Sequence, residues 1–104
     1  MTREEALQQL AAFRERIDDV DRRLLGLLNE RTGIVEEIGR VKRSARMPVY
    51  EPKREDEVFA NVTSNNRGPL PPEAVKRIFE RIIDEMRTVQ RLRIESGADG
   101  EPPC

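Results

Sequence analysis

The chain has 104 residues but contains no histidine, and its only cysteine is Cys104. Without histidine, a Ser-His-Asp triad and a Cys-His pair cannot form, and a zinc site would lack one of its ordinary ligands. A single cysteine also excludes a disulfide within the chain. Catalysis by this chain would therefore use Arg, Lys, Asp, Glu, Gln or backbone groups, and we expect no metal and no cofactor.

The sequence also lacks an excess of one charge and any long apolar run. Nineteen basic residues face twenty acidic ones, a net charge of -1, whereas nucleic-acid binders usually show a basic excess. No apolar run approaches the roughly 18–20 residues that span a membrane, and residues 1–5 lack the apolar segment of a signal peptide. We therefore expect a cytoplasmic protein with no nucleic-acid partner and no membrane partner.

Aromatic residues are scarce, at 4%, while charged residues make up 38% of the chain. Such a composition can indicate disorder, but the apolar residues recur at spacings of three and four, which is typical of amphipathic helices. The pattern predicts helices over 4–44, from Pro52 to about 65, and from the proline-rich run 69–72 to about 94. We expect an all-α domain over residues 1–95 and a disordered tail over 96–104.

The apolar residues of the two shorter helices are predicted to share one face on each. The run Asn-Asn-Arg-Gly at 65–68 predicts the end of the second helix, because Asn and Gly tolerate a left-handed cap. The expected face of the second helix comprises Glu55, Val58, Phe59 and Val62. The expected face of the third comprises Val75, Ile78, Phe79, Ile82, Ile83, Met86 and Val89.

The length of the first helix predicts a dimer. About 40 residues span about 60 Å, whereas a compact domain of 100 residues has a radius of gyration of about 13 Å. One short and one medium helix from the same chain cannot cover that length, and no proline within it marks a kink. We therefore expect a second copy of the chain to cover the rest, in a homodimer.

Polar residues interrupt the apolar stripes of the helices. Arg14, Arg31 and Lys42 lie on or beside the stripe of the first helix, and Gln90 shares the apolar face of the third. Each could extend along the edge of its stripe with its head group in water. Asp21 could pair with one cation, but the stripe has too few carboxylates for all three. The alternative is a small polyanionic ligand, because buried charges need partners and arginine binds carboxylates in bidentate fashion.

Several segments resemble, in order and in spacing, the helical (AroQ-type) chorismate mutases. They are F-R-E-R-I-D-D-V-D at 13–21, L-L-G-L-L-N-E-R at 24–31, I-G-R-V-K at 38–42, P-V-Y-E-P-K-R-E at 48–55, and I-F-E-R-I-I at 78–83 with Gln90. The resemblance covers roughly residues 7 to 93. It implies an intertwined homodimer with two equivalent active sites. Such an enzyme rearranges chorismate, a dianion, to prephenate in aromatic amino acid biosynthesis. This isomerase reaction needs no nucleophile, metal or proton transfer, which agrees with the missing histidine.

The resemblance also implies roles for the polar residues on the stripes. Arg14 would reach across from the partner chain to one substrate carboxylate, while Arg31 of the home chain binds the other. Lys42 and Gln90 would donate to the ether oxygen of the breaking bond. Catalysis would then consist of orientation and of electrostatic stabilisation in a cationic pocket.

Further roles fall on the segment that starts the second helix. Arg54 would add positive charge beside the carboxylates, and Glu55, together with Glu51, would position the ring hydroxyl. Two positions depart from the family pattern. Glu51 stands where some relatives have Asp, and Met86 stands where some have a serine that binds a carboxylate, so that contact is lost or replaced.

Two other functions fit parts of the sequence. Isochorismate pyruvate lyases resemble it too and would use the same cationic pocket, although the V-Y-E-P-K-R-E segment is closer to the mutases. A non-catalytic helical dimerisation module would show a continuous apolar seam, which Arg31, Lys42 and Gln90 interrupt. Activation by a partner enzyme of the aromatic pathway is left open.

Overall fold

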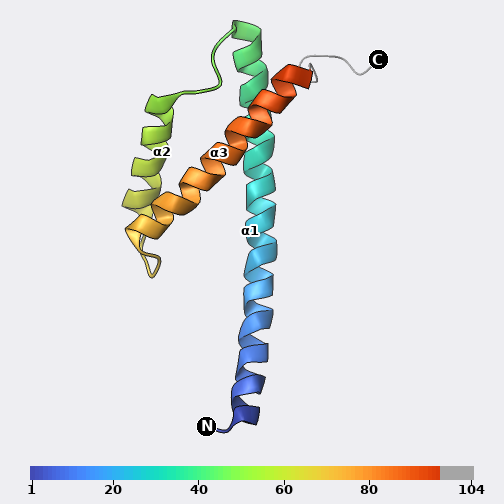
Figure 1. Ribbon diagram of the computed structural model, residues 1–104, viewed down its shortest axis with the longest axis vertical. Coiled ribbons are helices and arrows are strands. Elements are labelled where there is room, and N and C mark those ends of the chain that lie inside the picture. Colours follow the sequence, from blue (N-terminus) through green and yellow to red (C-terminus); the bar gives the residue numbers. More distant parts are fainter. Residues whose placement is uncertain (97–104) are drawn as a thin grey trace. The chain divides into compact units, whose positions relative to one another are not determined.

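The computed structural model describes the backbone of residues 1–96 and the side chains of residues 1–92. Within this range it consists of three α-helices and contains no strand: α1 (Arg3–Ala45), α2 (Pro52–Asn65) and α3 (Pro72–Ser96) (Figure 1). The predicted all-α fold with a very long first helix is confirmed, and the helix bounds lie within two residues of those predicted.

The chain divides into two compact units, Met1–Gly33 and a second unit that begins at Ile34, and the boundary falls within α1. Ser96, where the tail was expected to begin, still belongs to α3. The rest of that expected tail lies outside the described residues. Among the helices that the structure describes, none combines the length and the apolar character needed to cross a membrane.

The side chain of Thr2 caps the start of α1. The Thr2 Oγ1 accepts a hydrogen bond from the backbone N–H of Glu5 at 3.1 Å, which satisfies one of the free donors of the first turn. Glu4 and Glu5 lie in that turn, and Lys42 and Arg43 lie in the last one. These charges oppose the helix dipole at both ends and stabilise the long helix.

The end of α1 is a tight turn built on a left-handed residue. The Met47 N–H donates to the Lys42 carbonyl at 2.7 Å, and the Arg46 N–H donates to the Arg43 carbonyl at 3.2 Å. Arg46 has a φ of 57°, so this is the paired hydrogen-bond pattern that often ends helices, with arginine where glycine is usual. The turn stops α1 three residues after Lys42 and starts the loop to α2.

Helix α2 begins and ends at the predicted residues, but its cap differs from the predicted one. Pro52 occupies the first turn, where its missing N–H removes no helical hydrogen bond. At the other end Asn66 has extended backbone, with φ -75° and ψ 121°, so the left-handed asparagine cap is wrong. The left-handed residue is Gly68, with a φ of 74°, and its N–H donates to Asn66 Oδ1 at 3.0 Å.

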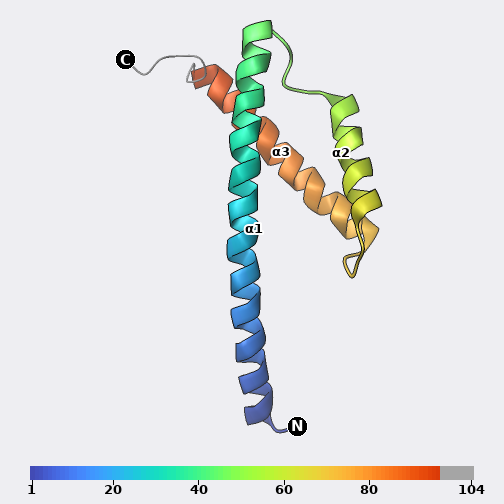
Figure 2. The same cartoon turned by 180° about the vertical axis from the view of Figure 1, so that it is seen from behind.

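Helices α2 and α3, joined by this short loop, contact each other and form most of the second unit (Figures 1 and 2). The predicted face of α2 is confirmed, since Glu55, Val58, Phe59 and Val62 are half-buried. The buried apolar side chains of the unit are Val35 of α1 with Val75, Ile83 and Met86 of α3. Ile78, which the helical spacing places on the apolar face of α3, is 46% exposed among the described residues.

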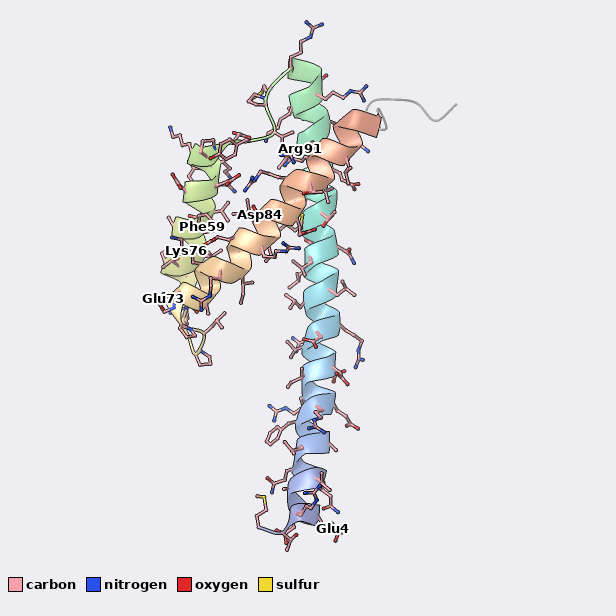
Figure 3. All side chains as sticks on the ribbon, viewed as in Figure 1. Glu4, Phe59, Glu73, Lys76, Asp84 and Arg91 are labelled. Atoms are coloured by element: carbon pink, nitrogen blue, oxygen red, sulfur yellow. The ribbon has the colours of Figure 1, made fainter. Side chains whose placement is uncertain are left out.

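The first unit is a single helix with a row of exposed apolar side chains. Its large apolar side chains are each at least 44% exposed, except Leu28, which is half-buried. The row comprises Leu7, Leu10, Phe13, Ile17, Val20, Leu24, Leu25 and Leu27. Figure 3 draws the side chains along this helix as sticks, with Glu4 labelled near its start. Amphipathic helices in globular proteins usually turn such a stripe toward a core.

The turn after α1 yields a stability prediction. Arg46→Gly should raise the free energy of unfolding by about 1 kcal/mol, because a left-handed backbone strains any side chain with a Cβ but not glycine. Ser44→Gly, inside the same helix, is the matched control and should lower stability by roughly 0.5–1 kcal/mol. Urea unfolding at one fixed protein concentration measures both. Equal losses in the two variants would contradict a left-handed Arg46.

Candidate active site

The second unit buries a lysine, which is the first sign of a functional site. Lys42 is 6% exposed, and a buried ammonium is unfavourable unless partners replace its water. Its Nζ lies 2.7 Å from Glu51 Oε1 and donates to the Val49 carbonyl at 2.9 Å. Both partners belong to the loop that follows α1. They account for two of the three N–H donors of the ammonium, so a third can serve a ligand.

Gln90 on α3 is the second buried polar side chain of this unit. It is 8% exposed, and its Oε1 is buried with no hydrogen-bond partner among the described residues. Leaving a buried acceptor unpaired costs about 1–3 kcal/mol, so a ligand atom that satisfies this amide would bind favourably. Rotation of the amide by half a turn places the NH₂ group where the oxygen lies. Gln90 can therefore offer a donor at this point.

A third polar group joins α2, α3 and the loop between α1 and α2. The Arg87 Nε lies 2.9 Å from Glu55 Oε2, although the N–H does not point along this line, so the contact is an ion pair and not an aligned hydrogen bond. The Arg87 Nη2 donates to Asp84 Oδ1 at 2.7 Å. The guanidinium carbon also lies 5.5 Å from the centre of the Tyr50 ring, within the range of a cation–π interaction.

Sequence reasoning missed Arg87 altogether. It found Gln90 because a polar residue stood on an apolar face, but Arg87 lies beside that face and pairs with a carboxylate from another helix. The available signal was local: Asp84 and Arg87 are three residues apart on α3, a spacing that favours ion pairs. The pairing of Lys42 with Glu51 was also missed, because Glu51 lies in the loop after α1 and not on the apolar stripe of that helix.

The other expected site residues lie in less enclosed places. Arg54 is exposed, and its Nη1 pairs with Glu57 Oε1 of the same helix at 3.2 Å. Arg14 is exposed and Arg31 is half-buried, and both belong to the first unit. The second unit therefore brings together Lys42 with Glu51, and Glu55 with Arg87.

The chemistry available here is that of charge and orientation. Within the described residues no group of three or more acidic, histidine or cysteine side chains could hold a metal ion. What the second unit does hold is a buried ammonium, a buried amide with an unpaired end, and a carboxylate paired with an arginine. Groups of this kind are able to orient an anionic molecule and to stabilise negative charge on it.

The fold and these groups define the chain as a small all-α protein that encloses charged and polar side chains between its helices. Comparison with known proteins identifies its family. A model of the family chorismate mutase type II matches residues 13–91. The chain is 33% identical over 89 residues to a bifunctional chorismate mutase/prephenate dehydratase of Aquifex aeolicus, covering 82% of this chain and 25% of the relative. It is 23% identical to a chorismate mutase of Methanocaldococcus jannaschii, covering 86% of this chain and 91% of that one.

A solved structure agrees with these matches. The chorismate mutase (Form II) of Thermus thermophilus is 37% identical, with a TM-score of 0.78 over 80% of this chain and 94% of that one. Since the family model spans 79 of the 104 residues, from 13 to 91, this chain belongs to the chorismate mutase type II family. It spans about a quarter of the length of the bifunctional relatives.

Lys42 is much more deeply buried than its partner Glu51, and this difference yields a second prediction. Glu51→Gln should lower the free energy of unfolding by about 1 kcal/mol, because it leaves a buried ammonium less compensated, while the partly exposed acid limits the loss. Lys42→Met should leave stability nearly unchanged, since Met fills similar space and Glu51 can turn to water. Thermal and urea unfolding measure both. A larger loss in Lys42→Met than in Glu51→Gln would contradict the described burial.

Proposed function

We propose that this chain is a chorismate mutase, which rearranges chorismate to prephenate. The carrying observation is that the second unit buries two polar groups, the Lys42 ammonium and the partly unsatisfied Gln90 amide. In the rearrangement one C–O bond breaks and one C–C bond forms within a single molecule, while negative charge grows on the ether oxygen. Fixed donors in a water-poor place stabilise that charge, and one such donor can contribute about 3–4 kcal/mol.

Binding of the dianion falls to the arginines. We assign one substrate carboxylate to Arg31 and the other to Arg14 of the partner subunit, with Arg54 adding positive charge nearby. Planar guanidinium groups bind carboxylates through two parallel hydrogen bonds, which would hold the flexible substrate in its reactive chair. Orientation of this kind supplies a large part of the rate in a unimolecular reaction.

The carboxylates orient the substrate's ring hydroxyl. Glu55 uses one oxygen for Arg87, so its second oxygen can accept from the hydroxyl. Glu51 holds Lys42 with Oε1 and has a second oxygen for the same purpose. Met86 is buried and apolar at the position of a serine in some relatives, so we assign it to packing and not to carboxylate binding.

We further propose that the working form is a homodimer with shared active sites. The exposed apolar row of the first unit supports this, because a second copy offers an equally long apolar stripe to cover it. We place the enzyme in the cytoplasm. Since several relatives are bifunctional chorismate mutase/prephenate dehydratases, we propose that the prephenate formed is passed to later enzymes of aromatic amino acid synthesis.

The direct test follows chorismate absorbance with purified protein and an assay for pyruvate. Loss of chorismate with formation of prephenate and no pyruvate supports the mutase. Release of pyruvate from isochorismate would instead identify the lyase activity that shares this fold. Unchanged absorbance of chorismate at micromolar protein would refute the proposal.

The shared site gives a prediction with a built-in control. Sedimentation should give about twice the monomer mass for Arg14→Ala and for Arg31→Ala. Each of these homodimers should be nearly inactive. After subunit exchange, each mixed dimer has one site with both lesions and one with neither. Activity per mixed dimer should therefore return to about half of wild type. If exchange restores nothing, both arginines serve the site of their own chain.

The role of Gln90 gives a prediction on pH. An amide does not titrate, but the carboxylate introduced by Gln90→Glu can only accept above its pKa, which is about 4.3 for an ordinary glutamate. It would repel the growing charge near neutral pH and donate only when protonated. The variant's kcat/KM should therefore be low at pH 7–8 and rise as pH falls, with a midpoint that burial raises and a nearby ammonium lowers.

The measurement compares kcat/KM of Gln90→Glu and wild type from about pH 4.5 to 8, within the range in which circular dichroism shows both folded. Wild type should lack the rise on the acid side. Parallel profiles would remove Gln90 from the donor role and leave it as a polar residue of the core.

A further inference from the structure

We propose that Arg87 is a positioning residue: it neutralises and orients the Glu55 carboxylate so that this acid can hold the substrate's ring hydroxyl beside two substrate carboxylates. The proposal rests on the proposed function, because Glu55 has this task only in a chorismate mutase. Neither the sequence pattern nor the family resemblance points to a role for Arg87. Three contacts that its guanidinium makes in the structure do.

The three contacts tie together separate parts of the second unit. Glu55 comes from α2, at 2.9 Å, and Asp84 from α3 itself, at 2.7 Å. Tyr50, from the loop between α1 and α2, lies under the guanidinium at 5.5 Å. A planar guanidinium with several donors can bind two acids at its edges while its face lies on an aromatic ring. Lysine has a point charge without such a plane, so it could keep only part of this arrangement.

Arg87 has little charge left over for the substrate. Its positive charge faces two carboxylates, Glu55 and Asp84, and its side chain is 29% exposed. Glu55 is the more enclosed acid, with its side chain 19% exposed against 56% for Asp84. The strongest effect of Arg87 therefore falls on Glu55, and Arg87 acts on the substrate only through that acid.

Glu55 needs such a partner because its task is electrostatically unfavourable. A carboxylate close to a dianion repels it, and the repulsion grows as water is excluded. An arginine on one carboxylate oxygen offsets this repulsion and restricts the side chain, while the other oxygen stays available as an acceptor. Without Arg87, Glu55 would both repel the substrate and lose its fixed orientation.

The predicted kinetic signature is an increase in KM. The hydroxyl contact and the repulsion are both present in the bound substrate and in the transition state, so losing Arg87 weakens both states together. Arg87→Met, which keeps the apolar stem, should raise KM about tenfold and change kcat less than about threefold. Arg87→Lys should recover part of the loss, because it restores the charge but not the planar fork.

A double-mutant cycle tests whether Arg87 acts through Glu55. Removing the Glu55 charge abolishes the repulsion that Arg87 offsets, so Arg87→Met should have little further effect on KM in a Glu55→Gln background. Arg81→Met is the matched control: Arg81 lies on the same helix and pairs with Glu85 at 2.9 Å, but its side chain is 77% exposed. We expect Arg81→Met to keep the KM of wild type.

Each outcome of this experiment is decisive. Circular dichroism and sedimentation establish that the variants are folded. If Arg87→Met does not fold, Arg87→Lys takes its place in the KM measurement. Independent, additive effects of Arg87→Met and Glu55→Gln on KM would overturn the positioning role, as would an unchanged KM in folded Arg87→Met. Absence of chorismate turnover by wild type would overturn the proposed function and this proposal with it. Turnover by wild type with an unchanged Arg87→Met overturns this proposal alone.

Discussion

Neutralising the buried ammonium of Lys42 is the constraint on which the second unit depends. Two loop groups do this, the carbonyl of Val49 at 2.9 Å and the carboxylate of Glu51 at 2.7 Å. Both can reach Lys42 only because α1 stops shortly after it, at a left-handed Arg46. Glu51 then directly precedes α2, and the same entry into the helix places Glu55 one turn on. The charge of one lysine thus links the end of α1 to the start of α2.

Three cations of the second unit, two of them enclosed and one exposed, each face a carboxylate before any ligand binds. Lys42 faces Glu51, Arg87 faces Glu55 and Asp84, and Arg54 faces Glu57. Enclosed cations without such partners would destabilise a domain with so small a core. Pairing also leaves each enclosed group with capacity to spare, since an ammonium has three donors and a carboxylate has two oxygens. Under the proposed function, the dianion would then bind without the protein first breaking all of its own contacts.

Much of the fold and part of the site follow from local rules. Helical spacing, Pro52 and the absence of proline between residues 4 and 44 predicted three helices with nearly correct bounds. The same spacing singled out Lys42 and Gln90, because polar residues on an apolar stripe are conspicuous. The exposure of Ile78 did not follow from the spacing, because a period of 3.6 residues indicates a face but not how much of it a neighbouring helix covers. The run at 65–68 ends α2 as predicted, but its left-handed residue is Gly68, which adopts that backbone without strain, and not Asn66.

The sequence by itself determined the helical architecture, the absence of histidine chemistry and the residues whose polarity conflicts with their helical face, since all of these depend on composition and on periodicity along one element. Only the tertiary structure decided which charges meet. The pairs Lys42–Glu51 and Arg87–Glu55 join residues from different elements, and the Tyr50 ring under Arg87 comes from a loop. Such pairings depend on where turns direct the chain and on how helices pack, and periodicity along one helix carries no information about either.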